Sequence, residues 1–269
     1  MRGLSRASLA EVEERFNAVA GSADLGTLAD ELFSVADLLD REHGLRRNLS
    51  DPARPAAQKA QVVRVLLEGK ISGAALETVI AAVSAKWARL GDLADALERL
   101  GVIAAAAEAE AQGRLDDVED ELFRFGRITA SNLELYRTLT APAAPAPAKR
   151  ELLNSLLAGK VAPTTLRLVI QLVLHPRGRS LDSGLAEFGR LVAAQRQRLV
   201  AVVRSAVVLS EVQKQRLATW LRTSYGRDVH LNVEVDPRVL GGFSVHIGDD
   251  LIDTTIAGRI EEVRRRLAG

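Results

Sequence analysis

The sequence has no cysteine among its 269 residues. This absence excludes disulfide bonds, thiolate nucleophiles, zinc fingers and iron–sulfur clusters. Aromatic residues make up only 4% of the chain, too few for the stacking platforms that hold single-stranded nucleic acid. A charge excess is also missing, because 36 Lys and Arg residues balance 35 Asp and Glu residues. We therefore expect no nucleic acid among the partners, since nucleic-acid-binding modules are usually strongly basic.

Long hydrophobic runs are missing as well. No window approaches the ~18 uninterrupted apolar residues of a membrane-spanning helix. Near the N-terminus, Glu11, Glu13 and Glu14 leave no apolar stretch for a signal peptide. With 47% hydrophobic and 26% charged residues, the chain is neither disordered nor fibrous. These properties predict a soluble, intracellular and mostly helical protein.

Two Gly-Lys pairs, Gly69-Lys70 and Gly159-Lys160, do not meet the requirements of a phosphate-binding loop. Such a loop needs a glycine five residues before its second glycine and a Ser or Thr after the lysine. The four positions concerned hold other residue types, namely Arg64, Ile71, Asn154 and Val161. We predict that both glycines end helices instead.

The side chains that could bind a metal or carry a reaction are not arranged to do so. No histidine has a second histidine or a carboxylate at ligand spacing on a shared helix face; the histidines are His43, His175, His230 and His246. Asp249, Asp250 and Asp253 do not follow the spacing of a calcium loop, and no serine lies in a nucleophile elbow. We expect no catalytic residue, no metal site and no cofactor.

The sequence does contain an internal repeat at an offset of 90 residues. Thirteen of the 32 positions from 49 to 80 are identical to their counterparts from 139 to 170, including matched prolines and a matched Gly-Lys pair. Asp30-Glu31-Leu32-Phe33 also returns as Asp120-Glu121-Leu122-Phe123. Matched prolines and glycines at one fixed offset indicate a duplicated block rather than chance similarity between Ala-rich helices.

Each copy has the periodicity of a helical bundle. One face carries Val62, Val63, Leu66 and Leu67, and a second carries Leu76, Val79, Ile80, Val83 and Trp87. A helix is expected over 93–111, interrupted at Gly101. The Pro-Ala segment 141–148 resembles an interdomain linker, but its counterpart 50–55 has the residues of a helix start, so we interpret both as turns between helices.

The N-terminal segment has an apolar stripe of its own, with acidic residues on the opposite side. The stripe is made of Leu9, Val12, Phe16 and Val19. Like the other stripes it is expected to be bundle core, and a partner-binding face is the alternative. Together these patterns predict a first helical bundle over residues 1–110 and a second helical copy over residues 111–198.

After residue 198 the pattern changes to that of an α+β module over residues 199–269. Residues 199–209 are β-branched and predict a strand, and Ser210-Glu211-Val212-Gln213 fits a capping box that begins a helix to about Tyr225. Strict alternation predicts strands over 229–235 and 243–247, followed by a turn, a strand over 251–253 and a last helix. The predicted fold class is mainly α, a duplicated helical bundle followed by a strand–helix–strand–hairpin–helix module.

The segment from 236 to 260 resembles the C-terminal signature of the F-type ATP synthase delta subunit family, whose mitochondrial members are called the oligomycin-sensitivity-conferral protein. The residues that carry this resemblance are Asp236, Pro237, Gly241, Gly242, Val245, Ile247, Gly248, Asp249, Ile252, Asp253, Ile256 and Arg259. Family members are usually shorter by about one helical copy. The chain is therefore similar to an enlarged, actinobacterial form with an internal duplication.

The resemblance implies a non-catalytic stator subunit. In that family the helical domain binds N-terminal segments of alpha subunits on the catalytic head, and the C-terminal module binds the end of the b subunit. The N-terminal stripe Leu9, Val12, Phe16 and Val19 is then a candidate alpha-binding face. The implied location is the cytoplasmic face of the cell membrane, through the complex alone. The alternatives are a free-standing helical-repeat adaptor and, with less support, an enzyme that uses carboxylates on helix faces.

Overall fold

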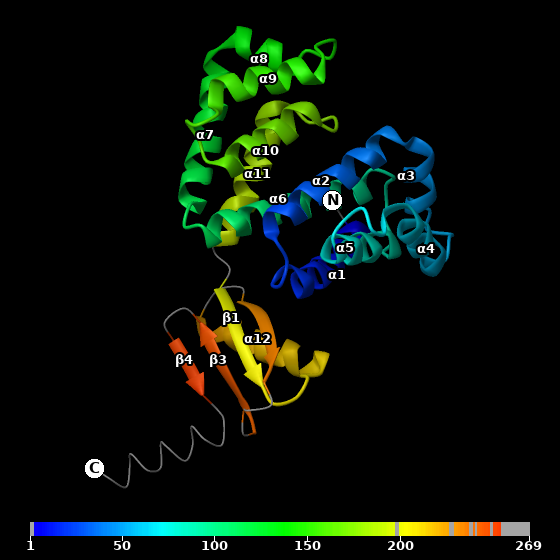
Figure 1. Cartoon of the computed structure of the whole chain (residues 1–269), viewed down its shortest axis with the longest axis vertical. Helices are drawn as coiled ribbons and strands as arrows, with labels where there is room; N and C mark the ends of the chain where they lie inside the picture. Colours follow the sequence, from blue (N-terminus) through cyan, green and yellow to red (C-terminus); the bar gives the residue numbers. More distant parts are fainter. Residues whose placement is uncertain are drawn as a thin grey trace, which may run out of the picture. The chain divides into compact units, whose positions relative to one another are not determined.

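A computed structural model describes residues 3–196, 199–225, 229–236, 239, 241–247 and 250–253. The chain forms two compact units, a helical unit over 1–195 and a C-terminal unit over 196–269 (Figure 1). The helical unit contains the helices α1 (Leu4–Ala20), α2 (Leu25–Arg41), α3 (His43–Ser50), α4 (Ala56–Leu67), α5 (Gly73–Ser84), α6 (Asp92–Ala111), α7 (Leu115–Ser131), α8 (Leu133–Thr140), α9 (Ala146–Leu157), α10 (Pro163–Leu174) and α11 (Leu181–Arg196).

The helix boundaries repeat at the same offset as the sequence. Each of the helices α7 to α10 begins and ends 90 residues after its counterpart among α2 to α5. Helix α11 follows α6 at nearly the same offset, and α1 moved by 90 residues falls inside α6. Helix α6 therefore takes two places in the repeat, as the last helix of the first copy and as the counterpart of α1 for the second.

A carboxylate on the second helix of each copy fixes the start of the fifth. Glu31 on α2 accepts hydrogen bonds from the Ser72 backbone N–H at 2.9 Å and from the Ser72 hydroxyl at 2.5 Å. Its counterpart Glu121 on α7 accepts bonds from the Ala162 N–H at 2.8 Å and the Thr165 hydroxyl at 2.5 Å. Both contacts satisfy N–H groups that the start of a helix leaves without an intrahelical partner.

The structure confirms that the Pro-Ala segment is a turn between helices, since α8 ends at Thr140 and α9 begins at Ala146. Two details of the helix predictions are wrong. Gly101 does not interrupt α6, which is continuous from Asp92 to Ala111. Its missing side chain leaves room for the Phe33 ring, which packs against it. Trp87 is not part of a helix; it lies after α5, where its indole N–H donates to the Ala82 carbonyl at 2.8 Å.

The core of the helical unit is one continuous cluster that runs through both copies. Helix α6 is buried along almost its whole length, and its alanines allow neighbouring helices to approach closely. Helix α2 lies along α6, as Figure 1 shows for the segments in blue and blue-green. The largest fully buried side chains in this unit are Phe188, Leu28, Leu32, Leu39, Leu93, Leu97, Leu100, Leu122, Leu139, Leu153, Leu168 and Leu172.

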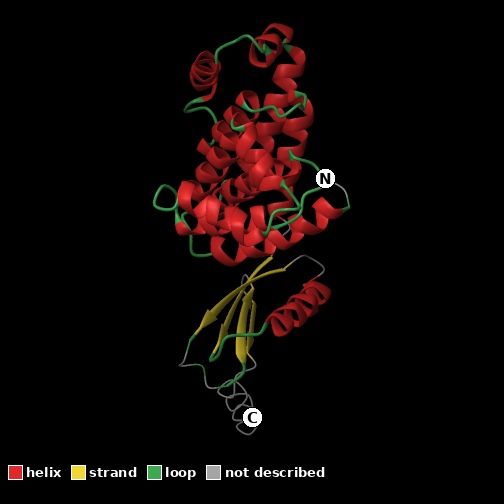
Figure 2. Cartoon of the chain, turned by 90° about the vertical axis from the view of Figure 1, so that its right-hand side faces the viewer, coloured by secondary structure: helices red, strands yellow, loops and turns green. Residues whose placement is uncertain are grey.

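The C-terminal unit is a four-stranded mixed sheet with a helix against it. Its elements are β1 (Leu199–Ser205), α12 (Glu211–Tyr225), β2 (Val229–Val235), β3 (Phe243–Ile247) and β4 (Asp250–Asp253), in the sheet order β2-β1-β3-β4. Strands β1 and β2 are parallel and are connected through α12, while β3 pairs antiparallel with β1 and β4. Helix α12 lies on one face of the sheet (Figure 2).

Strand alternation decides what this small unit buries. Leu217 and Leu221 of α12 pack in one cluster with Ala201, Val245 and Ile247 of the sheet. The predicted capping box is confirmed, because the Ser210 N–H donates to the Gln213 side chain and the Gln213 N–H donates to the Ser210 hydroxyl. Strand β1 is shorter than predicted and ends at Ser205. The predicted last helix lies outside the described residues.

Replacing Gly101 of α6 with alanine tests the close packing around this helix, and the same replacement at Gly189 of α11 is the control. A Cβ atom at Gly101 would lie 2.7 Å from Cε1 of Phe33, whereas one at Gly189 in α11 would meet nothing within 4 Å. We expect Gly101→Ala to lower the free energy of unfolding by ~1–3 kcal/mol through overpacking. Gly189→Ala should raise it by ~0.5–1 kcal/mol through helix propensity. Urea denaturation followed by circular dichroism measures both, and equal effects would contradict this account of α6.

Candidate functional site

The described part of the chain contains no group of three or more metal-binding side chains, and none of its helices is long and apolar enough to cross a membrane. His43 and His246 are exposed on separate units, and His175 pairs with Asp37 at 3.1 Å. Gly248 and Asp249 of the predicted turn lie outside the described residues.

The Gly-Lys pairs end helices as predicted. Gly69 and Gly159 have φ angles of +76° and +72°, a backbone region that favours glycine. They lie two residues after the ends of α4 and α9, and the N–H groups of Lys70 and Lys160 donate to the carbonyls of Leu67 and Leu157. This is the geometry of a helix C-terminus and requires no ligand.

The apolar stripe of α1 points largely into the helical unit. Val12 and Phe16 are only 1% and 2% exposed, and Leu9 is half-buried against the same core. Helix α1 packs against α5 and α6, which accounts for this burial. Val12 and Phe16 therefore have almost no surface to offer a partner. Val19, near the end of the helix, is half-buried and lies at the edge of a groove.

That groove lies where the end of α1, the start of α2 and the start of α5 meet. It has a volume of 520 Å³ and a mixed apolar and acidic lining: Ala18, Val19, Ser22, Ala23, Asp24, Thr27, Ser72, Gly73, Ala74 and Glu77. The side chain of Asp24 accepts a hydrogen bond from the Thr27 N–H, and this bond lowers the pKa of the Asp24 carboxyl. We call this feature the α1/α5 groove.

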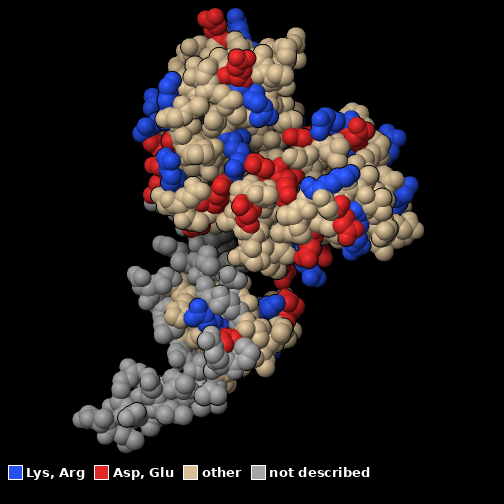
Figure 3. Space-filling model, viewed as in Figure 1, with Lys and Arg blue, Asp and Glu red and all other residues tan. Residues whose placement is uncertain are grey.

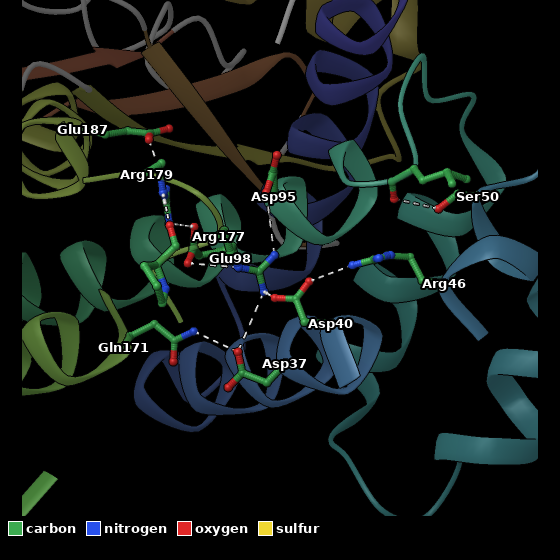
Figure 4. Close-up of polar contacts among 12 residues, drawn as sticks. Asp37, Asp40, Arg46, Ser50, Asp95, Glu98, Gln171, Arg177, Arg179 and Glu187 are labelled. Carbon is green, nitrogen blue, oxygen red and sulfur yellow. Dashed lines mark hydrogen bonds and ion pairs between the residues drawn. The ribbon is translucent and has the colours of Figure 1, made fainter. Parts of the chain in front are cut away.

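A cluster of ionic side chains joins the two helical copies (Figure 4). Its centre is Arg177, in the loop between α10 and α11, whose side chain is only 6% exposed. The Arg177 guanidinium lies 3.0 Å from Asp40 on α2 and 3.3 Å from Glu98 on α6. Arg179 in the same loop lies 2.6 Å from Glu98. These contacts tie the second copy to both long helices of the first.

Burial has a clear electrostatic effect in this cluster. It raises the pKa of Glu98 to about 7, although Arg177 and Arg179 act in the opposite direction. Burial also raises the pKa of Asp37 and Asp95. Such clusters are costly to desolvate, and removing one partner leaves a buried charge without its counterion.

Sequence reasoning missed this cluster, although one signal was present. Arg177 stands 90 residues after Trp87, so a buried aromatic residue of the first copy is replaced by a cation in the second. The φ angle of Arg177 is +51°, which is uncommon for a residue other than glycine. Its partners come from elements far apart in the sequence, and no local pattern identifies them.

The C-terminal unit exposes several large apolar side chains that the sequence analysis also missed. They are Val207, Val208, Val212, Trp220 and Val235, and Trp220 is 50% exposed. Val212 and Trp220 lie eight residues apart on α12, outside the stripe of the buried Leu217 and Leu221. Several exposed large apolar side chains in one small unit suit a contact with another protein.

The signature residues that the structure describes have structural positions. Val245 and Ile247 are buried in the sheet, and Gly241 and Gly242 have φ angles of +67° and +76° just before β3. Ile252 lies on β4 opposite Val245. Asp236 directly follows β2, and Asp253 ends β4. Pro237, Gly248, Asp249, Ile256 and Arg259 lie outside the described residues.

Glu98 predicts a pH dependence of stability. Its pKa in the folded chain is raised, so the folded state binds a proton that the unfolded state has lost between the ordinary pKa of 4.5 and about 7. The Glu98 contribution to stability is fully present below 4.5 and is lost as the pH rises through 7. We expect Glu98→Gln to flatten the dependence of Tm on pH between about 5 and 8, measured by circular dichroism. An unchanged slope would show that Glu98 titrates normally.

The chain is similar to known proteins over its whole length. A family model described as "ATP synthase delta (OSCP) subunit" matches residues 102–267. The chain is 51% identical to "ATP synthase subunit delta" of Thermobifida fusca and 50% identical to that of Streptomyces griseus, each over 100% of both chains. Among solved structures, a chain of the Toxoplasma gondii mitochondrial ATP synthase hexamer is 17% identical with a TM-score of 0.29, covering 62% of this chain and 95% of that one. On its full-length similarity and its family match, the chain belongs to the ATP synthase delta (OSCP) subunit family.

Proposed function

We propose that this chain is a non-catalytic peripheral-stalk subunit of an F-type, proton-transporting ATP synthase. The observation that carries the proposal is the full-length similarity, at 51% identity, to a protein named ATP synthase subunit delta. In this role the chain links the catalytic head to the stalk, so that the head does not turn with the rotor. Proton translocation then stays coupled to ATP synthesis.

The physical task of such a subunit is to transmit force through protein contacts. We propose that the helical unit binds the N-terminal segments of alpha subunits, and that the C-terminal unit binds the end of the b subunit. The groove at the end of α1 and the exposed Val212 and Trp220 of α12 support these two contacts, since both are open to a partner. The chain would reach the cytoplasmic face of the membrane only as part of this complex.

The family match bears on the division of the helical unit into residues 1–110 and 111–198. It begins at residue 102, inside α6, which holds the place of α1 for the second copy. We therefore propose that α6 to α11, together with residues 199–269, correspond to the usual family architecture. The first copy, α1 to α5, would then be the addition, and it shares α6 with the second.

A free-standing adaptor is the weaker interpretation. It accounts for the repeat, but it gives no reason for full-length similarity to proteins named as synthase subunits. Affinity capture of the tagged chain from native membranes separates the two interpretations by the composition of the recovered complex. Recovery with the alpha and b subunits is expected for the stator subunit. Recovery without any synthase subunit would contradict that role.

Trp220 gives a sharper test of the b contact. Because its side chain is half-exposed, Trp220→Glu should leave the fold intact while placing a charge at an exposed apolar position of α12. We expect this variant to bind a soluble b segment at least about tenfold more weakly, as expected for loss of an aromatic hot spot. Val65→Glu, which changes a 73% exposed side chain on α4, is the matched control and should bind normally. Isothermal titration calorimetry measures both, and normal binding by Trp220→Glu would exclude this position.

A further inference from the structure

A pocket of 530 Å³ lies in the second copy, between α8, α9, the end of α10 and the loop that leads to α11. Its walls are largely apolar, with Leu139, Leu172 and Leu181 among them, and it also has two cations, Lys149 and Arg179. None of the described residues that line it is acidic. We call this feature the α8/α10 pocket. Its volume is within the range of small-molecule sites.

The same place in the first copy is closed by side chains of the chain itself. The Trp87 indole, only 4% exposed, donates its N–H to the Ala82 carbonyl at 2.8 Å. The Lys59 ammonium donates to the Ala85 carbonyl at 3.5 Å, and the Ser50 hydroxyl donates to a carbonyl further along the same loop at 3.3 Å. These bonds hold α3 and α4 against the loop after α5.

Two of these contacts have no equivalent in the second copy. The residue 90 positions after Trp87 is Arg177, whose guanidinium lies against carboxylates of α2 and α6. The counterpart of the buried Ser50 is Thr140, which is exposed and donates to the Tyr136 carbonyl of its own helix at 2.7 Å. The second copy therefore lacks both the indole ring and the bond from α8 to the loop, and a pocket remains there.

The walls of the α8/α10 pocket indicate an aromatic guest. Leu172 lines the pocket and stands 90 residues after Ala82, the residue that receives the indole N–H in the first copy. Val173 and Leu181 add further apolar surface. The pocket thus keeps apolar walls at the place where the first copy packs an indole ring, and an aromatic ring from outside can bury its surface against them.

The cations of the pocket indicate that the guest is negatively charged. Arg179 already pairs with Glu98 at 2.6 Å and with Glu187 at 3.0 Å. Lys149 is half-buried and makes no ion pair or hydrogen bond within the described part of the chain, whereas its counterpart Lys59 is only 2% exposed and bonded. A carboxylate on the guest supplies the counterion that Lys149 lacks.

We propose that the α8/α10 pocket is a binding site for a small aromatic carboxylate, with the ring against Leu172 and the carboxylate on Lys149. The site shares no residue with the α1/α5 groove or with α12, and it does not rest on the proposed function. The loop at its wall also carries Arg177 and Arg179. An occupied pocket therefore holds in place the loop that ties the two helical copies together.

Indole-3-acetate is a suitable probe, because it combines an indole ring with a carboxylate. Isothermal titration calorimetry of the full chain should show one site per chain. Lys149→Met removes the charge but keeps a long apolar side chain, and we expect it to weaken binding at least about tenfold. Lys70→Met, which changes an exposed lysine after α4, is the matched control and should bind normally.

Filling the pocket tests its position independently of charge. Ala146 lines the pocket and is exposed, so Ala146→Trp should fold normally and place an indole ring where the probe binds. We expect this variant to lose binding of indole-3-acetate. Ala56→Trp makes the same change at the equivalent, also exposed position of the first copy and should have no effect. Circular dichroism checks that both variants are folded.

A second probe tests the assignment of an anion. Indole has the same ring without the carboxylate and should bind at least about tenfold more weakly than indole-3-acetate. Equal binding of the two probes, or normal binding of indole-3-acetate by Lys149→Met or by Ala146→Trp, would overturn the proposal. So would the absence of both binding heat and a rise in Tm when the wild-type chain meets millimolar indole-3-acetate. None of these outcomes bears on the stator role, which the capture experiment tests.

Discussion

The helical unit depends on the close packing of other helices around α6. Ala104, Ala105 and Ala106 have no exposed surface, and the missing side chain at Gly101 makes room for an aromatic ring of α2. Small residues lower the distance at which helices can pack, so α6 can belong to two copies at once. Without this shared helix the two copies would be separate bundles, and the chain would have a joint where a stator subunit needs stiffness.

The shared helix also explains why the two copies, similar in sequence, differ in what they expose. Helix α2 packs along α6, and α6 also belongs to the second copy. Helix α2 of the first copy therefore lies against the second copy. The acidic residues of α2 then face the basic residues of α10 and of the loop after it. Charges of both signs are interspersed elsewhere on the visible face of the helical unit (Figure 3). Complementarity between the copies is therefore local and specific to this junction.

Local signals in the sequence were sufficient for much of the fold. The turns at Pro52 and Pro142, the helix ends at Gly69 and Gly159, and the alternating strands of the C-terminal unit each depend on a few neighbouring residues, and all were predicted. The surfaces were harder to predict. The stripe with Val12 and Phe16 has the same periodicity whether it packs inward or meets a partner, and its burial follows from α5 and α6, which lie far along the chain. The cluster around Arg177 was missed for the same reason, since separate segments of the chain supply its charges.

The ionic cluster has a mechanical consequence for a subunit under torque. Apolar contacts between helices resist separation, but they are non-directional and permit small sliding movements. Beside the ion pairs of Arg177, the Arg179 guanidinium donates hydrogen bonds to Glu98 of α6 at 2.6 Å and to Glu187 of α11 at 3.0 Å, and these bonds fix the direction as well as the distance of the contact. A buried network of this kind adds little net stability, because desolvation offsets the attraction between the charges. Its contribution is to favour one arrangement of the two copies over others, and a force-transmitting subunit requires that single arrangement more than it requires additional stability.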